Sequence, residues 1–145
     1  MLGDTVTGGE FENGRLTSIT TRNHGDFKFE ADNFILASGN FFSKGLSSDV
    51  DGVYEPVFGL DVDSIAERPS WYRRNMFENQ PYMSFGVSVG SDFKASKGGA
   101  PVENLYAAGA VLSGFNALKE GSGAGISILT ALHVSSLILD SQKSL

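Results

Sequence analysis

The first 32 residues alternate between polar and apolar positions, a pattern typical of β-strands with one covered face. Two such runs, TVTGGEFE and RLTSITTR, flank Asn13-Gly14. This dipeptide predicts a tight hairpin, because a type I′ turn requires positive φ at both central residues. A second turn signal at 23–26 precedes the alternating segment FKF at 27–29. Residues 5–32 therefore predict an antiparallel meander.

Two later segments are short continuous apolar runs, FILA at 34–37 and LYAAGA at 105–110. Runs of this kind favour strands covered on both faces, as in a parallel sheet. Each ends in small residues, Ser38-Gly39 in the first and Gly109-Ala110 in the second, which let a ligand approach the strand end. Ligands of open α/β sheets bind at this carboxyl edge. The pattern predicts an α/β fold with a site there.

The C-terminal segment predicts a helix from Ser122 or Ala124 to Leu139. Apolar residues cover most of its circumference, which indicates a helix buried inside a soluble protein. It contains no charge, but its glycine and serine residues, Thr130 and His133 make it a poorer match to a membrane-spanning helix. Residues 141–145 are expected to form a frayed tail.

The region 41–100 is less regular and holds three of the four prolines and the single tryptophan. Ser70 to Glu78 predicts a short helix that ends before Pro81, and 85–89 predicts a strand. We interpret 41–100 as a cap inserted between two halves of one sheet. The meander and first buried strand then occupy 1–40. The second strand and the helix occupy 101–140, before a tail at 141–145.

Composition narrows the classes of function. A length of 145 residues with 41% hydrophobic residues suffices for one domain with a core. The formal net charge of −6, without a Lys/Arg cluster, argues against a nucleic-acid partner. The chain has no cysteine, so it carries neither disulfides nor Cys-ligated iron–sulfur clusters. Two histidines and scattered carboxylates predict no metal site.

The glycines at 121, 123 and 125 stand at the start of the predicted helix. They do not match the dinucleotide pattern G-x-G-x-x-G, because residue 126 is Ile, and no lysine follows to complete a phosphate loop. Free N–H groups and the helix dipole at such a start stabilise negative charge. The edge of a flavin that gains charge on reduction suits this position. Close packing of the helix on a strand explains the glycines equally well.

The order of these motifs carries a resemblance. A meander, DNFILASG, a long insert, ENLYAAGAV and a glycine-rich helix start resemble the second half of FAD-dependent oxidoreductases of the two-dinucleotide-fold type. Five stretches narrow the resemblance to the B-subunit family of anaerobic glycerol-3-phosphate dehydrogenase: FILASGNFFSKGL (34–46), EPVFGLDV (55–62), WYRRNMF (71–77), NQPYMSFGV (79–87) and ENLYAAGAVLSGFNALKEGSGAGISILTALH (103–133). The resemblance implies a partial Rossmann-like flavin-binding domain, its C-terminal half, with a β-meander and an inserted cap.

The resemblance also implies a function. Enzymes of this family oxidise sn-glycerol 3-phosphate to dihydroxyacetone phosphate and pass electrons toward quinone, for fumarate or nitrate respiration. The implied cofactor is a flavin, FMN in this polypeptide, with FAD as the alternative. The implied partners are an FAD-containing A subunit, together with a membrane-associated iron–sulfur C subunit. The implied location is cytoplasmic, peripheral to the inner membrane.

Carried onto this sequence, the family's flavin contacts fall at the two strand ends and the helix start: Ser38, Gly39, Gly109, Ala110, Gly121, Ser122, Gly123, Ala124 and Gly125. The sequence does not identify the catalytic residues, and the candidates are Arg73, Arg74 and Lys119. Arg73 and Arg74 are candidates for contact with a phosphate substrate, because arginine binds phosphate through paired hydrogen bonds. Lys119 is a candidate because it lies just before the glycine stretch. His24, in a turn, is interpreted as solvated, and His133 as a core or boundary histidine.

The chain departs from the family in two ways. The family's N-terminal half, with its nucleotide-binding strand, is not represented, so this chain by itself is expected to be inactive. Position 110 holds Ala, where many relatives place Asp or Glu for the ribityl chain. Two alternatives stay open: another flavoprotein, related to fumarate reductase or to thiamine biosynthesis, and a non-catalytic domain that oligomerises through an exposed half-sheet.

Overall fold

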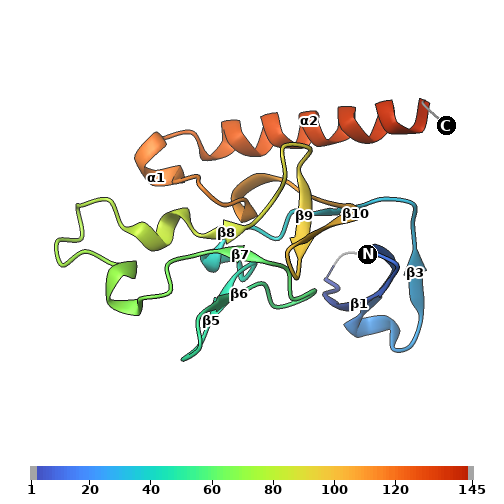
Figure 1. The fold of residues 1–145 in the computed structure, drawn as a ribbon, viewed down its shortest axis with the longest axis horizontal. Coiled ribbons are helices and arrows are strands. Elements are labelled where there is room, and N and C mark those ends of the chain that lie inside the picture. Colours follow the sequence, from blue (N-terminus) through green and yellow to red (C-terminus); the bar gives the residue numbers. More distant parts are fainter. Residues whose placement is uncertain (1–2, 144–145) are drawn as a thin grey trace.

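The computed structural model describes residues 3–143 and has a mixed α/β fold (Figure 1). The chain begins with an antiparallel meander, order β1-β2-β3, made of β1 (Val6–Glu12), β2 (Arg15–Thr21) and β3 (Lys28–Glu30). Asn13 and Gly14 join β1 to β2 with φ values of 49° and 79°. Both are positive, as a type I′ turn requires. The predicted meander and its hairpin are therefore confirmed.

The second sheet has the order β4-β10-β9, with β4 at Phe34–Leu36, β9 at Lys94–Lys97 and β10 at Ala100–Ala107. β4 runs parallel to β10, with Phe34 opposite Leu105, whereas β9 runs antiparallel. The predicted parallel pair is confirmed. Its coverage differs between the strands: residues 104–107 of β10 are buried, but Ile35 on the edge strand β4 is 49% exposed.

The region 41–100 contains two short ladders, β5 (Ser47–Ser48) with β6 (Val53–Tyr54), and β7 (Val62–Asp63) with β8 (Gly86–Val87). One hydrophobic core joins this region to both sheets. The region contributes Leu46, Phe58, Leu60 and Val87, and the sheets with their connections contribute Leu16, Leu36, Ala95, Val102, Leu105, Ala107, Val111 and Leu112. The division into cap and flavin-binding halves stays an interpretation.

The helix predicted from Ser70 to Glu78 is wrong. Short 3-10 helices cover Arg68–Trp71 and Pro81–Ser84, and the residues between them are irregular. The side chain of Asn75 accepts the backbone N–H of Phe77 at 3.1 Å. Side-chain bonding of this kind offers the backbone an alternative to a helical turn, so the chain bends where the apolar pattern predicted a helix.

The C-terminal part of the chain forms α1 (Ala117–Glu120) and the long helix α2 (Gly123–Lys143). The helix predicted here is confirmed in position, but it is longer. Residues 141–143 are helical rather than frayed, with Lys143 bonded to Asp140 at 3.2 Å across one turn. Residues 144–145 of the expected tail lie outside the described residues.

The predicted burial of this helix is wrong. α2 lies along one side of the β9–β10 strands, at the edge of the molecule (Figure 1). Val134 is fully buried against Tyr106 and Ala108. The opposite side of the helix is exposed although apolar, with exposures of 56–64% at Ile128, Leu129, Leu132 and Leu139. The described residues cover α2 with one layer only, so the apolar pattern on its second side has no partner among them.

By length and composition alone, α2 could cross a membrane: an 18-residue stretch of it has a mean hydropathy of 1.4, and only 6% of that stretch is buried. The core helix of a soluble protein can be equally long and apolar, although such a helix is mostly buried. These properties therefore do not assign α2 to a membrane.

Candidate functional site

The carboxyl ends of β4 and β10 meet at one edge of the second sheet. Parallel pairing places both ends on the same side. The pairing continues one residue past the strands, where the N–H of Ala108 donates to the carbonyl of Leu36 at 3.0 Å. Ser38-Gly39 and Gly109-Ala110 follow directly. The structure thus brings together the two small-residue strand ends that the sequence predicts as ligand contacts.

A hollow of about 430 Å³ lies beside β4 at this edge. Its walls are largely apolar, with Val6, Ile19 and Phe34 among them. Ser38 lines it, and the Ser38 hydroxyl is buried without a hydrogen-bond partner in the part of the chain that the structure describes. A buried polar group left unpaired costs about 1–3 kcal/mol. A ligand with an apolar body and one polar atom near Ser38 would remove this cost.

The loop after Ser38 is packed too tightly to accept larger residues. A Cβ atom on Gly45 would lie 1.9 Å from the carbonyl oxygen of Gly39. Gly39 itself has a φ of 78°, and a Cβ there would lie 2.7 Å from Ser43. Asn40 holds the turn by accepting the N–H of Phe42 at 3.1 Å. The loop therefore presents a rigid wall to the hollow.

Gly109 has a different role from Gly39. Its N–H donates to the hydroxyl of Thr130 at 2.9 Å, and a Cβ atom would lie 3.3 Å from the Ser127 hydroxyl. Both partners belong to α2. Close packing of helix on strand therefore explains this glycine, whose φ is 77°. Ala110, the position without a carboxylate, is half-buried beside it.

The three glycines at the helix start are not equivalent. Gly121 has a φ of 62° and ends α1, donating its N–H to the carbonyl of Ala117 at 3.1 Å. A Cβ on Gly123 would touch the Ala117 side chain at 3.4 Å, whereas a Cβ on Gly125 would meet nothing within 4 Å. The carbonyl of Ser122 accepts the N–H of residue 126 at 2.9 Å. Ala124 is exposed. Gly121 therefore serves the local turn, and Gly125 leaves open space at the start of α2.

The end of β10 contacts α2 shortly after its glycine-rich start. A Cβ atom on Gly109 would lie 3.3 Å from the hydroxyl of Ser127, two residues after Gly125, and the N–H of Gly109 donates to Thr130, seven residues after Gly123. Because an α-helix rises 1.5 Å per residue, these contacts lie about 3 to 10 Å along the helix axis from the glycines. The flavin contacts predicted at these positions stay predictions.

A larger cleft of about 760 Å³ lies between the 63–85 region and the segment after β10. Arg73 lines it, together with Asp63 and Ser113. The Ser113 hydroxyl donates to the Asp63 carboxylate at 2.6 Å. Sequence reasoning missed this pair, because the two residues are 50 positions apart and no motif contains both.

The other two cationic candidates lie elsewhere. Lys119 lines a separate hollow of about 420 Å³, and Arg74 does not line either cavity. Asn79 lines both cavities and accepts a hydrogen bond from the Asn116 amide at 2.8 Å. The structure therefore places Arg73 and Lys119 in neighbouring hollows rather than in one site.

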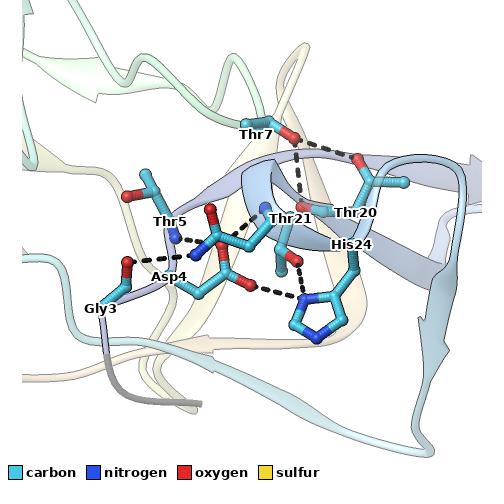
Figure 2. Close-up of polar contacts among 8 residues, drawn as sticks. Gly3, Asp4, Thr5, Thr7, Thr20, Thr21 and His24 are labelled. Atoms are coloured by element: carbon cyan, nitrogen blue, oxygen red, sulfur yellow. Dashed lines mark hydrogen bonds and ion pairs between the residues drawn. The ribbon is translucent and has the colours of Figure 1, made fainter.

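His24 belongs to a polar network at the end of the meander (Figure 2). Its Nδ1 lies 2.8 Å from the Asp4 carboxylate and 3.0 Å from the Thr21 hydroxyl. Hydrogen bonds from Thr21 and from the N–H groups of Asn23 and Thr5, with His24, hold the pKa of Asp4 well below its usual value of 3.8, although burial acts in the opposite direction. The network ties the start of the chain to β2, a structural role.

His133 also has a structural setting: its ring packs edge-on against Phe93, with centroids 5.1 Å apart. Within residues 3–143, no group of three or more His, Asp or Glu side chains is arranged to hold a metal ion.

Comparison with known proteins indicates a flavin-binding family. A family model described as "FAD binding domain" matches residues 1–126. Proteins named as the B subunit of anaerobic glycerol-3-phosphate dehydrogenase are similar to this chain. One from Yersinia pseudotuberculosis serotype I (strain IP32953) is 43% identical over 96% of this chain and 33% of its own length. One from Aliivibrio fischeri (strain MJ11) is 42% identical over 95% and 33%.

A further relative of the same name, from Actinobacillus succinogenes, is 41% identical over 97% of this chain and 34% of its own length. The chain thus spans about one third of the length of the curated relatives it matches. No solved structure matches the chain. The family match supports a flavin as the cofactor, without distinguishing FMN from FAD.

Proposed function

The chain belongs to the FAD-binding domain family, and on this basis we propose that it is part of a flavin-linked dehydrogenase that oxidises sn-glycerol 3-phosphate to dihydroxyacetone phosphate. The observation that carries the proposal is the edge where β4 and β10 end in parallel, beside a hollow lined by Ser38, whose buried hydroxyl has no hydrogen-bond partner within residues 3–143. The names of the relatives supply the reaction.

The residues at this edge suit a flavin. The apolar walls of the hollow match a flat aromatic ring, and the Ser38 hydroxyl offers a hydrogen bond to a polar ring edge. The start of α2 supplies free N–H groups and positive potential, with space beside Gly125. A bound flavin would supply the hydride acceptor for alcohol oxidation. The protein side of the site would orient it and exclude water from its ring.

Within the whole enzyme we propose that electrons pass toward quinone through partner polypeptides, one containing FAD and one containing iron–sulfur clusters. The word "subunit" in the relatives' names supports this arrangement. We place the complex on the cytoplasmic side of the inner membrane. Co-purification of tagged protein with iron analysis tests the proposed partners, and membrane fractionation tests the proposed location.

The cofactor is tested directly by titrating the chain with FMN and with FAD and following flavin fluorescence. Saturable quenching by one flavin, weakened by Ser38→Ala, supports the site, since the substitution removes the hydroxyl and little volume. Ser48→Ala, at an exposed serine that does not line this hollow, is the matched control. Quenching that is equal in all three proteins contradicts the assignment of Ser38.

The reaction is tested in the full-length polypeptide that carries this sequence, purified with its flavin. We expect reduction of an artificial electron acceptor with sn-glycerol 3-phosphate as the electron donor and not with succinate. Turnover of a dicarboxylate instead would favour the fumarate reductase-like alternative. A purified full-length protein without flavin absorbance in the visible range refutes the flavoprotein proposal.

A second candidate function is a non-catalytic domain that oligomerises. The exposed apolar side of α2 favours it, as does the edge of β4, which has no neighbouring strand within residues 3–143, because such surfaces pair readily. Light scattering after size-exclusion chromatography separates the two: a monodisperse monomer that binds flavin excludes oligomerisation as the function of the chain.

A further inference from the structure

The cleft of about 760 Å³ has the size of a small-molecule site and a mixed lining. Asp63, Ser84 and Ser113 line it with a carboxylate and two hydroxyls, and Phe85 adds an aromatic surface. Arg73 is the cation of its lining. Three separate segments of the chain converge here, and every lining residue belongs to residues 63–114.

The walls of the cleft are held in place by the fold. Gly114 donates its N–H to the carbonyl of Ser84 at 2.9 Å, and Ser113 donates its N–H to the carbonyl of Val87 at 3.3 Å. A Cβ atom on Gly86 would lie 2.3 Å from the backbone of residues 112 and 113. The segment after β10 therefore lies directly against β8, so this wall of the cleft is formed by packed backbone.

The two charged groups Asp63 and Arg73 differ in their hydrogen bonds within the cleft. The Asp63 carboxylate accepts the Ser113 hydroxyl through Oδ2, which orients it and leaves its other oxygen without a hydrogen bond within the described range. The Arg73 guanidinium makes no hydrogen bond or ion pair to residues 3–143; only its backbone N–H is bonded, to the Gln80 side chain at 2.7 Å. Both groups are free to bind a ligand.

We propose that this cleft binds a small polyol phosphate, with Arg73 contacting the phosphate and Asp63 accepting hydrogen bonds from the hydroxyl groups. A carboxylate acceptor fits vicinal hydroxyls, and a guanidinium fits phosphate through paired N–H donors. The choice of a polyol phosphate rests on the proposed function. The position of the site rests on the cleft alone.

The charges also set the orientation of the ligand. Glu78 lines the cleft, so the lining carries two carboxylates and one guanidinium. A phosphate is repelled by both carboxylates and must lie at Arg73, with the hydroxyl end toward Asp63. This arrangement predicts that removing the negative charge of Glu78 strengthens phosphate binding, because the repulsion between the two groups is lost.

The test is a titration of the chain with sn-glycerol 3-phosphate, followed by amide chemical shifts in nuclear magnetic resonance spectra. We expect Arg73→Ala to raise Kd roughly tenfold, the loss typical of a charge-assisted contact. Arg74→Ala is the matched control, since Arg74 is its sequence neighbour but does not line the cleft; its Kd should stay within about twofold. Shifts should concentrate at residues 63–65, 84–85 and 113–114.

Two further variants keep the test independent of folding defects. Glu78→Gln should lower Kd by roughly two- to threefold at low salt, and the gain should shrink at about 1 M salt, because exposed charges are then screened. A misfolded variant cannot bind more tightly. Asp63→Asn should weaken the binding of glycerol, which carries no phosphate, whereas Arg73→Ala should leave it unchanged.

Equal effects of Arg73→Ala and Arg74→Ala, or a Glu78→Gln variant that binds no more tightly, overturn the proposal. So do shifts confined to other surfaces. These outcomes leave the proposed function standing if the full-length protein still oxidises glycerol 3-phosphate. Conversely, specific binding in the cleft without dehydrogenase activity of the full-length flavoprotein keeps the site and refutes the function.

Discussion

Asn104 offers the sharpest test of what holds this fold together. It lies on β10, is 2% exposed, and its side chain makes three hydrogen bonds to backbone groups of other segments. Its Oδ1 accepts the N–H of Leu16 at 2.9 Å, and its Nδ2 donates to the carbonyls of Leu16 at 2.8 Å and Asp32 at 3.0 Å. One side chain thus fastens the meander to the second sheet.

The cost of Asn104→Ala follows from the groups it leaves unpaired. Leu16 is 1% exposed, so water cannot replace either of its two lost hydrogen bonds, whereas Asp32 is exposed. At about 1–3 kcal/mol for each buried unpaired group, the free energy of unfolding should fall by about 3 kcal/mol. This is a large part of the roughly 5–15 kcal/mol typical of a domain, and corresponds to a fall in Tm of roughly 10 °C.

Urea unfolding followed by circular dichroism measures this loss. Glu103→Ala is the matched control: Glu103 is the preceding residue, and its ion pair with Arg15, at 3.1 Å, is largely exposed. It should cost no more than about 0.5 kcal/mol. Asn104→Asp keeps the volume but replaces the donor by oxygen, and should also be strongly destabilising. If Asn104→Ala and Asn104→Asp both cost as little as Glu103→Ala, the reasoning is refuted.

Three further predictions concern separate parts of the molecule. The natural chain should be more stable than Asp4→Asn, with the full advantage above about pH 4 and a shrinking one as the pH falls below 3.8. The reason is that Asp4 of the unfolded chain then takes up a proton, whereas the folded carboxylate, with its lowered pKa, does not. Melting curves at about pH 7, 4 and 2.5 check this, and an advantage that grows toward the lowest pH contradicts it. Gly125→Ala should stabilise α2 by about 0.5–1 kcal/mol, and it should weaken flavin binding because its Cβ enters the open space at the helix start. Gly86→Ala should instead strongly destabilise the fold, because its Cβ overlaps with the backbone. If the stabilised Gly125→Ala variant binds flavin as tightly as the natural chain, Gly125 is not part of the site. Val134→Ala should lower the free energy of unfolding by about 2 kcal/mol, because it removes two buried methyl groups and leaves a cavity. Leu132→Ala, at a side chain that is 62% exposed on the same helix, should lower it by under about 0.5 kcal/mol. Urea unfolding of the isolated chain measures both, and equal losses would mean that both sides of α2 are covered in solution.

The structure also separates two explanations that the glycines left open. The sequence pattern at 121–125 fits both a ligand-binding helix start and tight packing. Gly121 ends α1 and Gly109 packs on α2, so local geometry accounts for both. Only Gly125 has free space at the position of a side chain among the helix-start glycines that lie within α2. The distinction needed coordinates, because a glycine in sequence does not reveal what approaches it.

Much of the architecture was accessible from local patterns. The hairpin at Asn13-Gly14 follows from the φ values that its turn requires, and the two parallel strands follow from short apolar runs with small residues at their ends. The order of the motifs was sufficient to indicate a flavin-binding family, which the match over residues 1–126 supports. Each of these features is indicated by short segments whose own residues are close together in the chain.

The remaining features depend on residues far apart. The Asp63–Ser113 hydrogen bond and the contacts of Asn104 join positions 50 to 88 residues apart, and no local pattern encodes them. The apolar periodicity of α2 correctly indicated a helix with two apolar sides, but the burial of a side depends on a neighbouring layer. Within residues 3–143, Tyr106, Ala108 and Phe93 cover one side of the helix, and Leu132 on the other side is exposed. Sequence determined which surfaces of this protein are apolar, and only the tertiary structure decided which of them are covered, because burial is a property of the contacts between segments and not of a segment itself.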